Sequence, residues 1–176
     1  MSETSASLLD RLQGSPDDDA WGRLVEIYTP MIRGWLRRHA MIHTEDAEDL
    51  VQDVLAVVVR RVREFRRERT GSFRAWLRQI TVNCLRDFWK SRRVRPTATG
   101  GSEFQQVLEQ LEDPGSGLSK LWDQEHDQHV TKQLLEMIRP SFEPKTWRAF
   151  SRVVLDGAAP DDVAAELSVT VNVVYI

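Results

Sequence analysis

The chain has 176 residues, of which 41% are hydrophobic and 29% charged, as is ordinary for a soluble globular protein. Its length suits one large or two small domains. The lone cysteine, Cys84, excludes a disulfide framework, and no apolar run approaches the roughly 18 residues of a membrane span. With a polar N-terminus that shows no secretory signal, we expect a cytoplasmic protein without membrane insertion. Apolar residues recur with helical period almost throughout, so we predict an all-α fold.

The N-terminal part is predicted to form two helices. Residues 5–13 read as a short helix, and Ser15 and Pro16 then mark the start of a second one, with Ser15 as cap and Pro16 at the first helical position. Pro30 is expected to kink or divide this second helix, because proline lacks the N–H that a helix interior needs.

Residues 45–66 are predicted to form one amphipathic helix, with Thr44 as cap and acidic residues in its first turn. At about 100° per residue, its apolar face comprises Ala47, Val51, Val54, Val58, Val62 and Phe65. Four polar residues lie on the opposite face: Asp49, Gln52, Asp53 and Arg60. A face of this kind is usually solvated, but it is also free to bind a partner.

Residues 72–93 are predicted to form the next helix, after a break at Gly71 and with Ser72 as cap. Its buried stripe comprises Phe73, Trp76, Leu77, Ile80, Cys84 and Phe88. Residues 60–95 hold 13 Lys and Arg against 3 Asp and Glu, a net charge of +10 in a chain whose total is −3. A basic patch on an acidic body indicates a polyanion bound at one site and repelled elsewhere.

Trp89 lies off that apolar stripe, among Arg86, Lys90 and Arg93. An indole in a basic cluster suits stacking on an unpaired base, a contact worth about 1–3 kcal/mol. Packing of Trp89 against the N-terminal helices explains the pattern equally well.

Residues 96–117 have the composition of a linker, with Gly, Pro and Ser on both sides of a short acidic segment at 103–112, for which a helix stays open. A mobile, solvated tether is the simpler interpretation. The alternative is that its acids screen the neighbouring basic surface in the free protein; they are Glu103, Glu109, Glu112 and Asp113.

Residues 118–176 are predicted to form a second helical domain. It ends in a short helix at 160–167, a turn at 168–170 and a new helix from Val171, which is a helix-turn-helix pattern. The sequence stops at Ile176, and Lys and Arg are absent after Arg152. Since a DNA-reading helix is usually longer and carries cations for phosphates, we expect the chain to be truncated here.

Three stretches, taken together, resemble region two of bacterial RNA polymerase sigma factors, and among these the small extracytoplasmic-function group. They are DAEDLVQD at 46–53, GSFRAWL at 71–77, and Asn83 with Asp87 in the following helix. The helix-turn-helix resembles region four of the same group. The resemblance implies two small helical domains: a region-two-like domain at 1–95, a flexible linker at 96–117, and a region-four-like domain at 118–176.

This resemblance implies a sigma factor that directs RNA polymerase to promoters and melts their DNA, without a cofactor. Its partners would be core polymerase, promoter DNA and, as a candidate, an anti-sigma factor. Core-polymerase docking is implied for Asp49, Gln52, Asp53 and Arg60. Promoter contact is implied for Arg66, Arg67, Arg69, Arg74, Asn83, Arg86, Asp87, Trp89, Lys90, Arg93, Val171, Asn172 and Tyr175. The Arg that typically precedes Asn83 is replaced by Val82, so one phosphate contact is expected to be missing.

The sequence carries no enzyme signature, since Gly-rich phosphate loops, HExxH, CxxC and GxSxG motifs are absent. His126 and His129 lie three residues apart near Asp123 and Asp127, but further metal ligands are not indicated, so we predict a polar face there. Two other functions fit parts of the pattern: a helix-turn-helix regulator of duplex DNA, and a module that binds polymerase or an anti-sigma factor without productive DNA contact.

Overall fold

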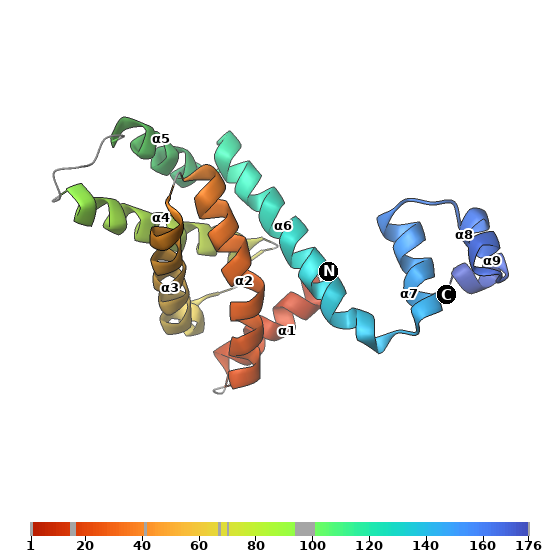
Figure 1. Cartoon of the computed structure of the whole chain (residues 1–176). Coiled ribbons are helices and arrows are strands. Elements are labelled where there is room, and N and C mark those ends of the chain that lie inside the picture. Colours follow the sequence, from red (N-terminus) through yellow and green to blue (C-terminus); the bar gives the residue numbers. More distant parts are fainter. Residues whose placement is uncertain are drawn as a thin grey trace. The chain divides into compact units, whose positions relative to one another are not determined.

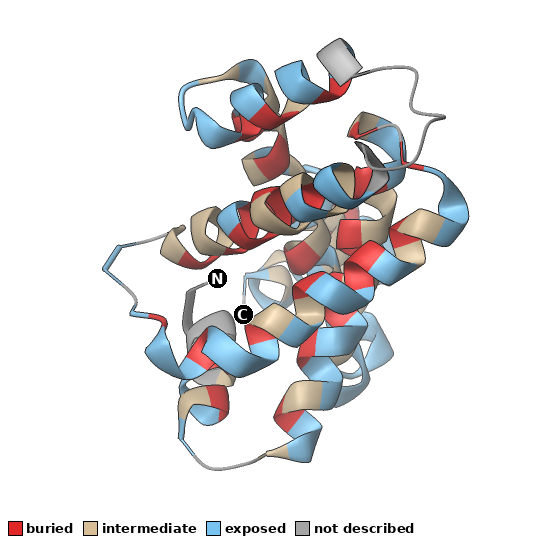
Figure 2. Ribbon diagram, turned by 90° about the vertical axis from the view of Figure 1, so that its left-hand side faces the viewer, coloured by how far each residue is buried: buried red, intermediate tan, exposed pale blue. Residues whose placement is uncertain are grey.

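The computed structural model describes residues 2–14, 17–40, 42–66, 68–69, 71–93 and 101–175. Regular structure in these ranges is helical throughout, which confirms the all-α prediction (Figure 1). The helices carry buried residues on one side and exposed residues on the other (Figure 2). The chain divides into two compact units, Met1–Thr131 and Lys132–Ile176. No helix in the described ranges is both long enough and apolar enough to cross a membrane.

The first unit is built from five complete helices and the beginning of a sixth. They are α1 (Ser2–Gln13), α2 (Asp18–His39), α3 (Thr44–Arg61), α4 (Ser72–Arg93), α5 (Gly101–Glu112) and α6 (Gly117–Ile138). Consecutive helices from α1 to α5 pack against one another, and the short 3₁₀ turn that follows α3 packs against α1. The core is made of aliphatic and aromatic side chains; its largest fully buried members include Trp35, Trp122, Leu24, Leu36, Leu50, Leu77 and Leu85.

The helix starts differ from the sequence prediction in two places. Asp17, and not Ser15, caps α2, because its carboxylate accepts a hydrogen bond of 2.9 Å from the Ala20 N–H. Ser15 and Pro16 lie outside the described residues. Thr44 is the first residue of α3 and not its cap, and the preceding His43 makes no capping hydrogen bond with its side chain.

Two helix lengths also differ from expectation. Pro30 does not divide α2, which runs unbroken through it; the proline is exposed, so water can reach the carbonyl that loses its partner. α3 ends at Arg61 and not at residue 66, and the 3₁₀ turn Val62–Glu64 replaces its last turns. Gln13 of α1 holds this turn, because its amide donates a hydrogen bond of 3.1 Å to the Val62 carbonyl.

The predicted mobile tether at 96–117 is wrong for its described part. Residues from Gly101 onward form α5, whose Phe104, Leu108 and Leu111 are buried. Their spacing of four and three residues gives α5 an apolar face, which packs on α4. The domain boundary moves accordingly, from 117/118 in the sequence prediction to 131/132 in the structure. The sequence left a helix at 103–112 open, but it did not predict that this helix is part of the first unit's core.

The second unit contains the end of α6, a 3₁₀ turn and three short helices. The helices are α7 (Pro144–Phe150), α8 (Pro160–Leu167) and α9 (Val171–Val174), and α7 continues into a π-helical turn, Ser151–Leu155. Val163 and Ala164 of α8 are its buried residues. Glu166 accepts hydrogen bonds from Arg148 and Arg152, which links α8 to α7 and the turn that follows it.

Candidate nucleic-acid interface

The outer face of α3 carries the four polar residues that the sequence singled out. Asp49, Gln52, Asp53 and Arg60 are all exposed, while Ala47, Leu50, Val51, Val54 and Val58 on the other side are buried. Neither Asp49 nor Asp53 takes part in an ion pair among the described residues. These carboxylates are therefore available to a partner.

Cys84 lies close to this face and is half-buried. Burial, together with the negative charges of Asp53 and Asp87, raises the pKa of its thiol to about 11. The thiol therefore stays protonated near neutral pH, and Cys84 serves as a packing residue.

α4 has two buried faces and one exposed face. The first buried face holds the predicted stripe, of which Phe73, Leu77 and Ile80 are buried. The second, which sequence periodicity missed, holds Arg78, Thr81, Val82 and Leu85. The exposed face carries Gln79, Asp87 and Lys90, with Asn83 and Arg86 half-buried beside them. Val82 is fully buried, so its side chain belongs to the core and not to the exposed face of α4.

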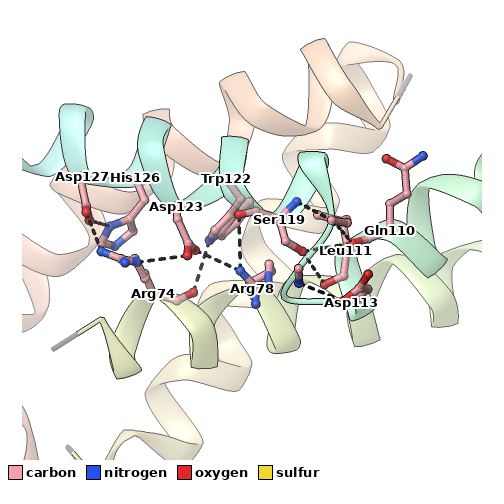
Figure 3. A network of polar contacts seen from close by, with 12 residues as sticks. Arg74, Arg78, Gln110, Leu111, Asp113, Ser119, Trp122, Asp123, His126 and Asp127 are labelled. Carbon is pink, nitrogen blue, oxygen red and sulfur yellow. Dashed lines mark hydrogen bonds and ion pairs between the residues drawn. The ribbon is translucent and has the colours of Figure 1, made fainter. Parts of the chain in front are cut away.

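Arg74 and Arg78 project from α4 toward α6, where carboxylates meet them (Figure 3). The Arg74 guanidinium lies 2.5 Å from Asp127 and 3.4 Å from Asp123, and that of Arg78 lies 3.0 Å from Asp123. The Trp122 indole donates a hydrogen bond of 3.2 Å to the Arg74 carbonyl. Arg74, predicted to contact DNA, thus lies in an ion-pair network away from the exposed face of α4.

The corner between α5 and α6 is fixed by Ser119, which is fully buried (Figure 3). Its hydroxyl lies 3.0 Å from the Gln110 carbonyl and 3.2 Å from that of Leu111, so it caps the last turn of α5. The turn between the helices is stabilised by Asp113, whose carboxylate accepts a hydrogen bond of 2.8 Å from the Gly115 N–H. α5 and the start of α6 therefore form one rigid corner.

Histidines attach α6 to α2. His39 lies 2.9 Å from Glu125, and His129 lies 2.8 Å from the Ile27 carbonyl. His126 is buried against Tyr28, with ring centroids 5.7 Å apart. Among the residues that the structure describes, no group of three or more His, Cys, Asp and Glu side chains is arranged to hold a metal ion. His126 and His129 contact protein groups of the first unit's interior and not, as predicted, only a polar surface.

Trp89 stacks on Phe104 of α5, with ring centroids 4.5 Å apart and the planes 17° from parallel. This contact matches neither of the two interpretations of Trp89, an unpaired base or the N-terminal helices. One face of the Trp89 indole is therefore covered by α5. Phe104 could have been identified as its partner only from the apolar face of α5.

Three residues on the exposed side of α4 contact one another. The Asn83 carbonyl oxygen accepts hydrogen bonds of 3.1 Å from Arg86 and 3.3 Å from Gln79. Arg86 also forms an ion pair with Glu112, the last residue of α5. The structure thus brings Asn83 and Arg86 together, with Lys90 exposed one turn farther along the helix.

The loop before α4 adds cations at the N-terminal end of that helix. Arg66 and Arg69 are exposed, while Arg67 lies outside the described residues, as does the side chain of Arg93. Gly71 ends the loop with a φ of +81°, and a Cβ atom there would lie 2.9 Å from the Arg74 guanidinium carbon. The positive φ favours glycine at this position, whereas the flexible Arg74 side chain could move away from a Cβ atom.

Residues 24–95 match the family model described as sigma-70 region 2. The match supports a sigma factor of the sigma-70 family. No curated protein matches the chain. The region 2 family implies core RNA polymerase and promoter DNA as partners, and it supports a role in promoter recognition and transcription initiation.

The segment that matches region 2 is supported by helices outside the matched range. The match ends at residue 95, before α5 begins at Gly101. Nevertheless α5 and the first part of α6 belong to the same compact unit, through Phe104, Trp122 and the Arg74 ion pairs. Arg78 and Phe104 are contacting residues that sequence reasoning did not assign, whereas the ion pair of Glu112 with Arg86 agrees with the alternative in which acids of this segment screen the basic surface.

The remaining predicted DNA contacts lie in the second unit. A three-residue turn joins α8 to α9, and Ser168 within it adopts a left-handed conformation with φ of 55°. Val171 is half-buried, while Asn172 and Tyr175 are exposed. An apolar hollow of about 580 Å³ lies between α7 and α9, lined by residues that include Phe142, Trp147, Val173 and Tyr175.

Proposed function

We propose that this protein is a sigma factor of the extracytoplasmic-function type, whose α4 captures the unpaired non-template strand of a promoter. The observation that carries the proposal is the exposed face of α4. It offers a hydrogen-bonding amide, Asn83, between the basic loop at Arg66 and Arg69 and the exposed Lys90.

The chemistry of this face suits single-stranded DNA. Unstacking a base pair costs a few kcal/mol, so a melting protein must bind the single strand more tightly than the duplex. Exposed Arg and Lys side chains follow the phosphates without reading sequence, whereas an amide can read the edge of a base. Arg66, Arg69 and Lys90 would take the first role and Asn83 the second.

The outer face of α3 would dock on the clamp coiled coil of the polymerase's largest subunit. Exposed charged residues on a rigid, well-packed helix give specificity and a fast approach to an oppositely charged surface. Asp49, Gln52, Asp53 and Arg60 form such a face, and the buried residues behind them hold α3 in place. In the second unit, α9 would present Val171, Asn172 and Tyr175 to the upstream promoter element in the manner of region four.

The test of the docking face is the affinity for core polymerase. The double variant Asp49→Arg with Asp53→Arg is expected to weaken binding at least about tenfold, or 1.4 kcal/mol, with unchanged helicity. The matched control is Asp10→Arg with Glu26→Arg, which reverses two exposed acids elsewhere in the first unit and should stay within about threefold. Equal affinities for the two double variants would show that the docking face is assigned wrongly.

A further inference from the structure

A chain of contacts leads from the end of α5 to the exposed face of α4. Glu112 pairs with one terminal nitrogen of Arg86, and the other terminal nitrogen of Arg86 donates a hydrogen bond of 3.1 Å to the Asn83 oxygen. Gln79, one turn earlier on α4, donates to the same oxygen at 3.3 Å. The planar guanidinium therefore bridges a carboxylate and an amide, an arrangement that restricts the rotation of both.

These contacts settle which end of the Asn83 amide faces outward. A guanidinium can only donate hydrogen bonds, so the Asn83 atom facing Arg86 must be its oxygen. That oxygen has two lone pairs and two donors, so its accepting capacity is used. The amide nitrogen has no hydrogen-bond partner among the residues that the structure describes, and the side chain is partly exposed. Asn83 thus offers two N–H donors and no free acceptor.

We propose that Glu112 is a positioning residue for promoter recognition: through Arg86 it fixes Asn83 as a hydrogen-bond donor, which selects a base with a carbonyl group. This inference rests on the proposed function, in which Asn83 faces a base of the unpaired strand. Guanine and thymine carry an exocyclic carbonyl where adenine and cytosine carry an amino group. The N–H groups of Asn83 can donate a hydrogen bond to the carbonyl of guanine or thymine. Opposite adenine or cytosine, they would face an amino group, which is itself a donor.

Glu112 suits a positioning role better than a role in stability. It is exposed at the last position of α5 and outside the range matched by region 2. An exposed ion pair contributes little to folding, so its loss should leave the fold intact. Without Glu112, Arg86 is free to leave Asn83, and the amide can rotate to present its oxygen to an amino group.

The experiment uses the holoenzyme formed from the full chain and core polymerase, on promoter templates with a pre-opened, non-complementary segment. In such templates only the non-template base changes, so duplex melting does not affect the comparison. Each position of the segment carries each of the four bases in turn, and open-complex formation is measured. The position at which Asn83→Ala changes the base preference is the position that Asn83 reads.

At that position we expect the wild type to favour guanine or thymine over adenine and cytosine by about fivefold, the worth of one neutral hydrogen bond. Glu112→Ala should reduce this preference to within about twofold, and so should Arg86→Lys, which keeps the charge but lacks the planar fork. Glu109→Ala is the matched control, because it removes the same charge from an exposed residue of the same helix and should leave the preference unchanged. In an Asn83→Ala background, Glu112→Ala should have no further effect on preference.

Three results would overturn the inference while leaving the proposed function intact. They are an unchanged base preference in Glu112→Ala, a wild-type preference for adenine and cytosine, or an equal rise of open-complex formation with all four bases in Glu112→Ala. The last would mean that Glu112 competes with a DNA phosphate for Arg86. If Asn83→Ala changed the preference at none of the positions, the role of Asn83 in the proposed function would fail first. The same readout therefore separates the two failures.

Discussion

Trp122 of α6 packs edge-on against Trp35 of α2, with ring centroids 4.9 Å apart, and both side chains are fully buried. Sequence composition assigned α6 to the second domain. The Trp35–Trp122 contact instead attaches α6 to the centre of the first unit. Aromatic pairs in this geometry stabilise a core beyond the area that they bury. α6 therefore supports region 2 directly, along with the Arg74 and Arg78 ion pairs beside it.

Truncating Trp122 should destabilise the first unit strongly. Trp122→Ala removes the contact with Trp35, leaves a cavity and deprives the Arg74 carbonyl of its donor, so we expect a loss of about 3–5 kcal/mol in the free energy of unfolding. Chemical denaturation followed by circular dichroism measures this loss. Trp147→Ala, which removes an indole from the second unit, should leave the first unit's transition in place. An unchanged first transition in Trp122→Ala would show that α6 is not part of that core.

The stability of the first unit should fall as the pH drops below about 7, through His126. Burial lowers the pKa of His126, and the charge of Arg74 lowers it further. Asp127 and Asp123 act in the opposite direction, because they favour the charged imidazolium. An unfolded histidine titrates near pH 6.5, so the unfolded state takes up the proton first as pH falls. Folding stability is then lost between about pH 7 and the lower pKa of the folded state, by at most about 1.4 kcal/mol per pH unit.

His126→Phe tests this pH dependence. Phenylalanine keeps an aromatic ring beside Tyr28 but does not titrate, so the variant should lose less stability than the wild type between pH 7.5 and pH 5.5, on the order of 1 kcal/mol. Glu125 and Glu48 do not contribute to the change in stability over this pH range. The pKa of each carboxyl lies below its ordinary value, so both carboxyls titrate at lower pH. Parallel pH profiles for the two proteins would exclude His126 as the source.

Lys90→Ala should weaken open-complex formation on all promoters alike. Lys90 is exposed on the same side of α4 as Asn83, where a cation contacts phosphate and not a base edge. Loss of one phosphate contact reduces the slope of log K against log salt concentration by about 0.7 for single-stranded DNA. Open-complex formation across a salt series measures the slope. A change in promoter preference with an unchanged slope would instead place Lys90 against a base.

Several features were determined by local sequence alone. The apolar repeats at three and four residues predicted α3 and α4, the buried side of α3 and the first buried face of α4, because a helix that buries one stripe must place apolar residues at that period. The exposed position of Asp49 and Asp53 follows from the same periodicity. The break at Gly71 was also visible, since a left-handed residue before a helix favours glycine.

The roles of the basic residues were decided only by tertiary structure. Arg74 and Arg86 lie on one helix in a run of cations, and nothing local distinguishes them. Their partners, Asp127 and Glu112, lie 53 and 26 positions farther along the chain, and folding brings them together. Lys90, without such a partner among the described residues, stays exposed.

The second buried face of α4 was hidden for the same reason. Val82 and Leu85 share this face with Arg78 and Thr81, two polar residues that an apolar repeat does not include. α5 packs on α4, and Asp123 of α6 forms an ion pair with Arg78. Those helices were read as a tether and a separate domain, because Gly and Pro between elements indicate where a chain turns and not what it packs against. Local periodicity identifies the main apolar stripe of a helix. Which further residues are buried, and what buries them, depends on contacts between distant residues, whose energy no single stretch of sequence contains.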